Sequence, residues 1–415
     1  MHDAGPAPRN AATLADMTLD PPDAVGRPMR LATIVLILLA GVMTGAQLGK
    51  IAPLVPWYGA EPGLSLVATG WLVAILGIFI AFVALPSGWV IDRLGLMHAI
   101  GGGVAALAIG GTALAVSVSP AAIFASRLVE AAGYLVLCIA LPVALNAVSP
   151  THWKGPVLAI WSGFVPLGFA ASDFLAAAML PHVGPPVFLL ALTALFTAFS
   201  VAALALLRGF TIDAPAGGGG AVLPTLSRNV ILLALAFGAF VVLSVSMFAF
   251  MPSFVAGEGA HYLVSAGMVA LSVPIGNVLA SVLVRGRDVG FMARLALAGF
   301  AVSVVAAAPA FTLSDPLLAT VSALALAISG AVVASALFAA IPFLTPQNGS
   351  VSIAFGLVVQ AGGIGTLFGP PVAGAVVDAF GWAGFGWFLA GTALAGLACM
   401  MPIAAVSGRG RRPRR

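Results

Sequence analysis

Long uncharged apolar stretches are the feature that most limits what this chain can fold into. Residues 31–43 and 231–250 are two examples. Only 7% of the 415 residues are charged and 61% are hydrophobic, whereas a soluble domain carries about 25% charged residues. In lipid, only helices and closed barrels satisfy every backbone group. Barrel strands alternate apolar and polar residues, and these stretches do not, so the sequence predicts an all-α membrane protein.

Proline, glycine and charged residues divide the apolar sequence into twelve segments, each near the roughly 20 residues that span a bilayer. The longest break, 208–228, contains four consecutive glycines and separates two sets of six segments. We therefore expect one six-helix bundle at 31–207 and a second at 229–404, joined by a cytoplasmic linker. Residues 1–30 are expected to form a disordered cytoplasmic tail, and 405–415 a basic one. The expected helices are 31–56, 64–90, 97–117, 120–148, 155–180, 184–207, 229–254, 262–284, 291–310, 315–342, 347–376 and 381–404.

The positions of the basic residues fit this topology with both termini in the cytoplasm. Lys and Arg concentrate in the cytoplasmic loops of membrane proteins. The basic residues on that side would be Arg9, Arg27, Arg30, Arg93, Lys154, Arg208, Arg228, Arg285, Arg287, Arg294, Arg409, Arg411, Arg412, Arg414 and Arg415. The expected outer loops contain no Lys or Arg, and their charged residues are Glu61, Glu258, Asp315 and Asp378. Removing one helix would invert every later loop and destroy this pattern.

Composition and motifs also exclude several functions. The sequence pI is near 9.6, but five arginines lie in the last seven positions, where they suit anionic lipid headgroups better than nucleic acid. Cys138 and Cys399 lie far apart in apolar segments, so no disulfide or metal site is expected. The chain has no P-loop, His-Glu-x-x-His or Gly-x-Ser-x-Gly motif. We therefore expect neither an enzyme nor a cofactor.

Several short motifs resemble those of the major facilitator superfamily. Residues 88–95, Gly-Trp-Val-Ile-Asp-Arg-Leu-Gly, resemble its signature between helices 2 and 3. Residues 285–290, at the matching place in the second half, resemble the same signature more weakly. Arg127, Glu130 and Gly133 resemble its Arg-x-x-Gln-Gly-x-Gly pattern in helix 4. The helix 11 segment resembles its Gly/Pro motif through Gly365, Gly369, Pro370 and Gly374.

The resemblance covers about residues 31–405 and implies two six-helix bundles that rock about a site near the bilayer midplane. It implies that helices 1 and 4 line a central cavity. It also implies a conformational switch formed by Gly88, Asp92, Arg93 and Gly95, and helix packing by the glycines and proline of helix 11. The stretch 45–50, which contains Gln47 and Lys50, together with Trp161 and the 166–168 turn, is similar to the cyanate and nitroimidazole transporter group of this superfamily.

Four charges remain inside the expected helices: Lys50, Arg127, Glu130 and Asp173. A charged side chain in a bilayer is unfavourable in free energy, so it usually has a charged partner, contacts water or serves a function. The helix rise of about 1.5 Å per residue predicts that all four lie in one layer of the outer half. They could form a neutral ionic cluster that locks helices together, or a site that binds a proton at Glu130 or Asp173 and an anionic substrate at Lys50 or Arg127. Lys50 could instead extend to the outer interface.

Gln47, Asn277, Gln360 and Trp161 complete the candidate substrate or coupling residues. The prediction is a secondary transporter of a small solute, with an organic or inorganic anion as the expected class, coupled to protons. A membrane-embedded ligand sensor and a membrane enzyme are the alternatives. The expected partners are the substrate, H⁺ and the lipid bilayer, and neither nucleic acid nor a metal. We expect a multi-pass monomer in a plasma membrane, specifically a bacterial inner membrane.

The predicted topology can be tested with reporter fusions. Because the expected outer loops lack Lys and Arg, a reporter fused after Arg415 should be cytoplasmic and one inserted beside Glu258 should be external. Activity of a compartment-specific reporter enzyme measures both. An external reporter after Arg415 would contradict an even number of helices.

Overall fold

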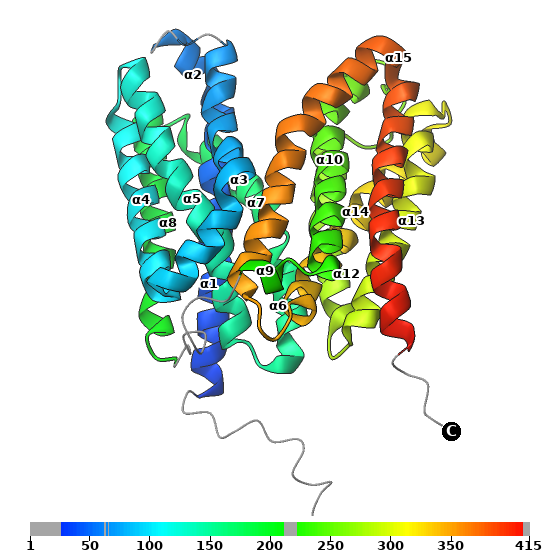
Figure 1. Cartoon of the computed structure of the whole chain (residues 1–415). Coiled ribbons are helices and arrows are strands. Elements are labelled where there is room, and N and C mark those ends of the chain that lie inside the picture. The colour runs from blue at the N-terminus through cyan, green and yellow to red at the C-terminus, as the bar shows by residue number, and fades with distance from the viewer. Residues whose placement is uncertain (1–25, 62–63, 65, 211–221, 410–415) are drawn as a thin grey trace, which may run out of the picture.

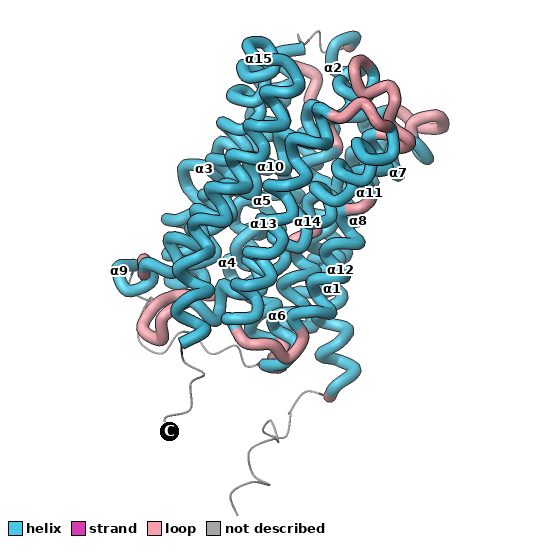
Figure 2. Tube along the Cα trace, turned by 90° about the vertical axis from the view of Figure 1, so that its right-hand side faces the viewer, coloured by secondary structure: helices cyan, strands magenta, loops and turns pink. Residues whose placement is uncertain are grey.

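The computed structural model describes residues 26–61, 64, 66–210 and 222–409. Within these ranges the chain consists of helices and loops, without strands (Figures 1 and 2). Most of the tail predicted at 1–30, the centre of the linker predicted at 208–228 and the end of the basic tail lie outside the described residues.

The helices pack in two groups that follow the order of the chain. In the first group, α1 contacts α5, α7 and α8, and α4 contacts α5 and α8. In the second, α10 contacts α14 and α15, and α13 contacts both as well. The first group comprises α1 (Arg27–Gly49), a 3₁₀ turn (Ala52–Leu54), α2 (Val55–Ala60), α3 (Leu66–Leu94), α4 (Leu96–Val116), α5 (Pro120–Val148), α6 (Thr151–Trp161), α7 (Phe164–Met179) and α8 (Pro185–Leu207). The second comprises α9 (Val222–Thr225), α10 (Arg228–Ala256), α11 (Ala266–Leu271), α12 (Val273–Val284), α13 (Val289–Thr312), α14 (Pro316–Leu344) and α15 (Val351–Arg409).

Among the described residues, nine helices are long and apolar enough to cross a membrane. The pair α6 and α7 bends by 49° at a short break and counts as a tenth span. Helix α15 has 59 residues and turns at Gly381, whose φ of 66° is left-handed. In Figure 1 this helix runs the length of the molecule and then returns. The apolar α12 has 12 residues and follows the short α11.

Local sequence explains where several helices begin. The Asp315 side chain accepts a hydrogen bond from the backbone N–H of Leu318 at 2.8 Å, and Pro316 occupies the first turn of α14. At the start of α5, the Ser119 side chain accepts a hydrogen bond from the backbone N–H of Ala122, and Pro120 occupies the first turn. A capping oxygen satisfies an N–H that the helix leaves unpaired, and proline has no N–H to lose there. These residues therefore end one apolar segment and begin the next.

The described ends of the chain lie at the same end of the molecule. In Figure 1, α1 begins and α15 finishes at the bottom, and we call this the proximal end. The short helix α2 lies at the opposite, distal end (Figures 1 and 2). Lys50 directly follows α1 and Arg127 is in the second turn of α5, so both lie in the distal half.

Hydrogen bonds join the two groups in the proximal half. The N–H of Leu85 on α3 donates to Gln360 Oε1 on α15 at 3.0 Å. Ser281 on α12 donates to the carbonyl of Pro156 on α6 at 3.0 Å. A third set connects Ser162, after α6, with α12 and α14. All of these bonds involve residues in the proximal half of their helix or helix pair.

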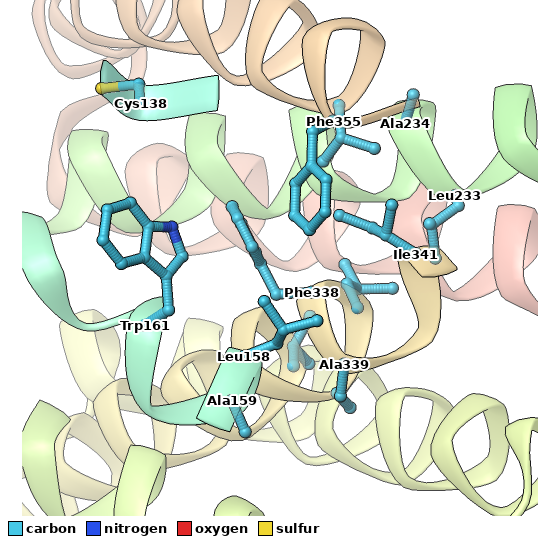
Figure 3. Close-up of a cluster of buried hydrophobic side chains, with 14 of the residues drawn as sticks. Cys138, Leu158, Ala159, Trp161, Leu233, Ala234, Phe338, Ala339, Ile341 and Phe355 are labelled. Carbon is cyan, nitrogen blue, oxygen red and sulfur yellow. The ribbon is translucent and has the colours of Figure 1, made fainter. Parts of the chain in front are cut away.

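An apolar core also crosses between the groups. Figure 3 shows Leu158 and Trp161 of α6 beside Phe338 of α14 and Phe355 of α15, and all four are buried. A second buried cluster at the distal end draws only on the first group, with Tyr58 and Leu72 among its members. The proximal core is thus shared by the two groups, whereas this distal cluster belongs to one.

Candidate functional site

Lys50, Arg127 and Glu130 form a buried ionic triad in the first group. All three side chains are 0% exposed. Lys50 Nζ donates to Glu130 Oε1, and Arg127 Nη1 donates to Glu130 Oε2 at 2.6 Å. Since Arg127 and Glu130 are three residues apart on α5, they share a helix face. Each carboxylate oxygen of Glu130 therefore has its own cationic partner.

Neighbouring helices supply the remaining hydrogen bonds of the triad. Arg127 Nε donates to the carbonyl of Leu72 on α3 at 2.9 Å, and its Nη1 donates to the carbonyl of Gln47 on α1 at 3.1 Å. The Gln47 side chain accepts from Lys50 Nζ at 2.8 Å and donates to the carbonyl of Leu192 on α8 at 3.3 Å. The triad thus ties together α1, α3, α5 and α8.

Two glycines on α4 make room for the Glu130 side chain. A Cβ at Gly110 would lie 2.6 Å from Glu130 Cγ and 2.8 Å from its backbone N. A Cβ at Gly111 would lie 2.5 Å from Thr193 Oγ1 and 3.1 Å from Glu130 Oε1. Any larger residue would displace the carboxylate or the helix that carries it.

Two polar atoms near the triad have no hydrogen-bond partner among the described residues. They are Nη2 of Arg127 and the hydroxyl of Tyr58, and both are buried. Tyr58, on α2, is within electrostatic range of Arg127 and Glu130 and is 0% exposed. A hydroxyl or guanidinium N–H that is buried without a partner is unfavourable in free energy. A further polar group that bonded these two atoms would therefore be stabilised at this end of the triad.

Asp173 does not join the triad, and the prediction that all four charges could form one ionic cluster was wrong. Its side chain is exposed on α7, at a shallow hollow between α7 and the turn at Pro53. The buried residues of α7 are Gly168, Ser172 and Ala176, which leaves Asp173 on another face. Helix rise predicts depth but not direction around the helix, and this caused the error.

Two other expectations for the triad also need correction. Lys50 does not extend to an interface, because its ammonium position is fully buried against Glu130. The triad is fully buried in this conformation, so it does not face an open cavity, and its hydrogen-bond partners among the described residues belong to α1, α3, α5 and α8. It lies inside the first group and away from the interface between the groups.

Gln360, Asn277 and Trp161 lie where the two groups meet. Gln360 accepts the Leu85 N–H across the interface. Asn277 Oδ1 accepts from Ser162 at 3.3 Å and from Ser335 at 2.9 Å. Trp161 is 1% exposed and stacks on Phe164 with ring centroids 4.6 Å apart. These residues form a proximal contact layer that is separate from the triad.

The helix 2–3 motif lies at the same proximal interface. A Cβ at Gly88 would come within 2.6 Å of the carbonyl oxygen of Ser352, so α3 and the start of α15 are in backbone contact. Arg93 lies over the Trp89 ring at 3.8 Å, and Gly95 has a φ of 81°. Oδ2 of Asp92 is buried without a hydrogen-bond partner among the described residues. Gly88 of this segment therefore lies in the contact between the two groups.

The Gly/Pro segment of α15 packs within the second group. A Cβ at Gly365 would lie 2.8 Å from the carbonyl of Gly238, and one at Gly369 3.2 Å from Val242 Cα. Gly374 faces Phe250 in the same way, and Pro370 lies within the same stretch of α15. All three glycine contacts are with α10, so this segment allows close packing of α10 and α15.

Three residues of these sites were missed at the level of sequence: Tyr58, Ser162 and Ser335. Hydroxyl residues are common in membrane helices, so Tyr58 and Ser335 carry no distinct signal. Ser162 does carry one, because it precedes Gly163 at the break between α6 and α7. Among the described residues, no group of three His, Cys, Asp or Glu side chains could hold a metal ion.

Comparisons with known proteins agree with this fold. The family model described as Major Facilitator Superfamily matches residues 37–364. Among curated proteins, none matches the sequence.

Solved structures of low sequence identity share the fold over nearly their whole length. The human organic anion transporter MFSD10 (TETRAN) is 16% identical, with a TM-score of 0.69 over 90% of this chain and 99% of its own. The proton:xylose symporter XylE is 16% identical, with a TM-score of 0.72 over 91% and 96%. A bacterial homologue of the iron transporter ferroportin in an outward-facing state is 14% identical, with a TM-score of 0.71 over 90% and 99%.

The contact between α4 and Glu130 predicts a sharp difference between two glycine substitutions. Gly110→Ala should destabilise the protein by about 1–3 kcal/mol, because the new methyl group overlaps Glu130. Gly102→Ala on the same helix is the matched control, since a Cβ there meets nothing within 4 Å, and it should leave stability unchanged or higher. Melting temperature in detergent compares the two. Equal melting temperatures would contradict the close packing at Glu130.

Proposed function

Because this chain is a member of the Major Facilitator Superfamily, we propose that it carries a small solute across a membrane by alternating access. Its family and its transporter neighbours indicate a transporter rather than an enzyme. One observation carries the mechanism: the hydrogen bonds between the two groups lie in the proximal half. Alternating access requires such a state, closed at one end, and a second state closed at the other.

We propose that the chain crosses the membrane twelve times with both termini in the cytoplasm. Three features support this count beyond the nine long helices: the turn of α15 at Gly381, the bent pair α6 and α7, and the pair α11 and α12. The two groups then correspond to bundles at 31–207 and 229–404. The proximal end is cytoplasmic in this proposal, and the conformation is outward-facing, as in the ferroportin homologue.

We propose that a proton gradient drives transport and that the triad is the coupling site. A triad that ties α1, α3, α5 and α8 together can change the packing of the first bundle when its charge changes. The proton:xylose symporter XylE shares the fold. The organic anion transporter MFSD10 also shares the fold, and an anionic substrate stays a prediction for this chain. In this conformation both Lys50 and Arg127 bind Glu130, so an anion would have to displace Glu130 or bind elsewhere.

The remaining parts of the proposal concern location and assembly. A monomer in a bacterial inner membrane fits the proposed topology and the basic residues on its cytoplasmic side. The likeness of residues 45–50 to the cyanate and nitroimidazole transporter group suggests small, compact solutes. A ligand sensor with the same fold is the alternative, and it would bind a solute without moving it.

Flux across a membrane tests the proposal. Purified protein is first screened by melting temperature against small organic anions, cations and neutral metabolites. The stabilising compound is then offered, as a radiolabelled probe, to sealed vesicles that contain the protein. We expect accumulation under a proton gradient and its loss when a protonophore is added. Specific binding without flux would favour the sensor, and accumulation that persists with the protonophore would contradict proton coupling.

The hydrogen bond across the proximal interface predicts the effect of a substitution at Gln360. Gln360→Met keeps the side-chain length but removes the acceptor for the Leu85 N–H. A typical hydrogen bond contributes about 0.5–1.5 kcal/mol, so the ratio of the two states should shift about 2- to 12-fold away from the proximally closed one. Gln347→Met, at an exposed position of the loop before α15, is the control. The readout is alkylation of a cysteine placed at Ser352, which should be faster in the Gln360 variant. Equal rates in both variants would contradict this role.

A further inference from the structure

The triad contains an unequal number of charges. With every side chain ionised, two cations and one carboxylate give a net charge of +1 at three fully buried residues. Asp173, the fourth charge expected there, lies on another face of α7. Among the described residues, the groups that neighbouring elements place around the triad and Gln47 are uncharged: Leu72 O from α3, glycines from α4, Leu192 O and Thr193 from α8 and the Tyr58 hydroxyl from α2. A net charge enclosed in this way is unfavourable.

Of the three ionisable groups, only Lys50 can relieve the excess charge. Arg127 stays protonated in proteins. Protonation of Glu130 would raise the net charge to +2 and remove the only anion that faces both cations. Loss of one proton from Lys50 leaves a neutral unit made of the Arg127 cation and the Glu130 anion. The net charge of the triad therefore identifies Lys50 as the group whose protonation state changes.

The hydrogen bonds of Lys50 support the same assignment. An ammonium has three N–H donors and no acceptor, whereas a neutral amine has two N–H donors and a lone pair. Lys50 Nζ has two acceptors among the described residues, Gln47 Oε1 at 2.8 Å and Glu130 Oε1. A neutral amine satisfies both. A third N–H would be buried without an acceptor.

We infer that Lys50 is the residue that takes up and releases the coupling proton, while Glu130 remains a carboxylate in both states. On release, one N–H bond of the ammonium breaks, the electron pair stays on Nζ, and the proton passes to a water molecule. The neutral amine belongs to the proximally closed conformation, in which Nζ is fully covered. The charged form belongs to a conformation in which water reaches the triad. Acidification therefore drives the protein away from the conformation described here.

This inference rests on the proposed proton coupling, but it is testable without a known substrate. Spin labels are attached to cysteines at Val118 and Leu317, which are exposed at the distal ends of the first and second group. The label distance is measured on the full chain in lipid nanodiscs from pH 5 to pH 9, in a Cys399→Ala background. In the wild type, the ratio of the two populations should change up to about tenfold per pH unit, as expected for one proton.

Three substitutions decide the outcome. Lys50→Met has no proton to release and should keep the distal ends apart at every pH. Lys50→Arg keeps its charge and should hold the acid-type distribution at every pH. Lys154→Met changes the only other lysine of the chain and should titrate as the wild type does. If Lys50→Met does not fold, the Lys50→Arg variant, which retains the charge, still decides.

Two results would overturn the inference. One is wild-type pH dependence in both Lys50 variants. The other is a population ratio that follows chloride concentration at fixed pH, because a small anion at Arg127 Nη2 and Tyr58 would then compensate the charge. If solute flux proves independent of protons while the label distance still titrates through Lys50, the proposed coupling fails and the assignment of the titrating residue stands.

Discussion

Glu130 is the residue on which the interior of the first group depends. Its two oxygens accept hydrogen bonds from Lys50, which directly follows α1, and from Arg127 on its own helix. Arg127 extends these bonds to α1 and α3. Removing one partner of a buried ion pair typically costs about 3–5 kcal/mol, because the other charge is left uncompensated. Gly110 and Gly111 on α4 leave the space that this carboxylate occupies. Sequence features on five helices thus follow from one buried anion.

The triad and the proximal interface have different structural roles: the interface joins the two groups, and the triad joins helices within the first group. The interface contains apolar side chains, serines, Asn277 and Gln360. Such contacts are individually weak, and they can be broken and reformed at low cost. The triad is enclosed within one group, so under the proposed alternating access it would move with that group as a unit. A change in its charge would act by altering the shape of the first group.

The sequence was sufficient for the fold class because lipid imposes strong rules on composition. The helical architecture follows from long apolar segments, and the family follows from motifs at residues 88–95 and 127–133. Lys50, Arg127 and Glu130 were identifiable because charges within membrane helices are rare. Asp173 was grouped with them in error, since sequence spacing predicts depth but not which neighbour a side chain faces. The partner of Gln360 could not be predicted either, because it is a backbone group on a helix 275 positions away.

The donor and the acceptor of the hydrogen bond between the Leu85 N–H and Gln360 differ in how a substitution affects them. The donor is a main-chain group, so any non-proline residue at position 85 retains it. The acceptor is a side chain, and a single substitution on α15 removes it or changes its reach. The balance between the two end states can therefore drift through mutations on α15 while α3 stays unaltered. In a set of related sequences, loss or change of this hydrogen bond would appear as a substitution at position 360 and not at position 85.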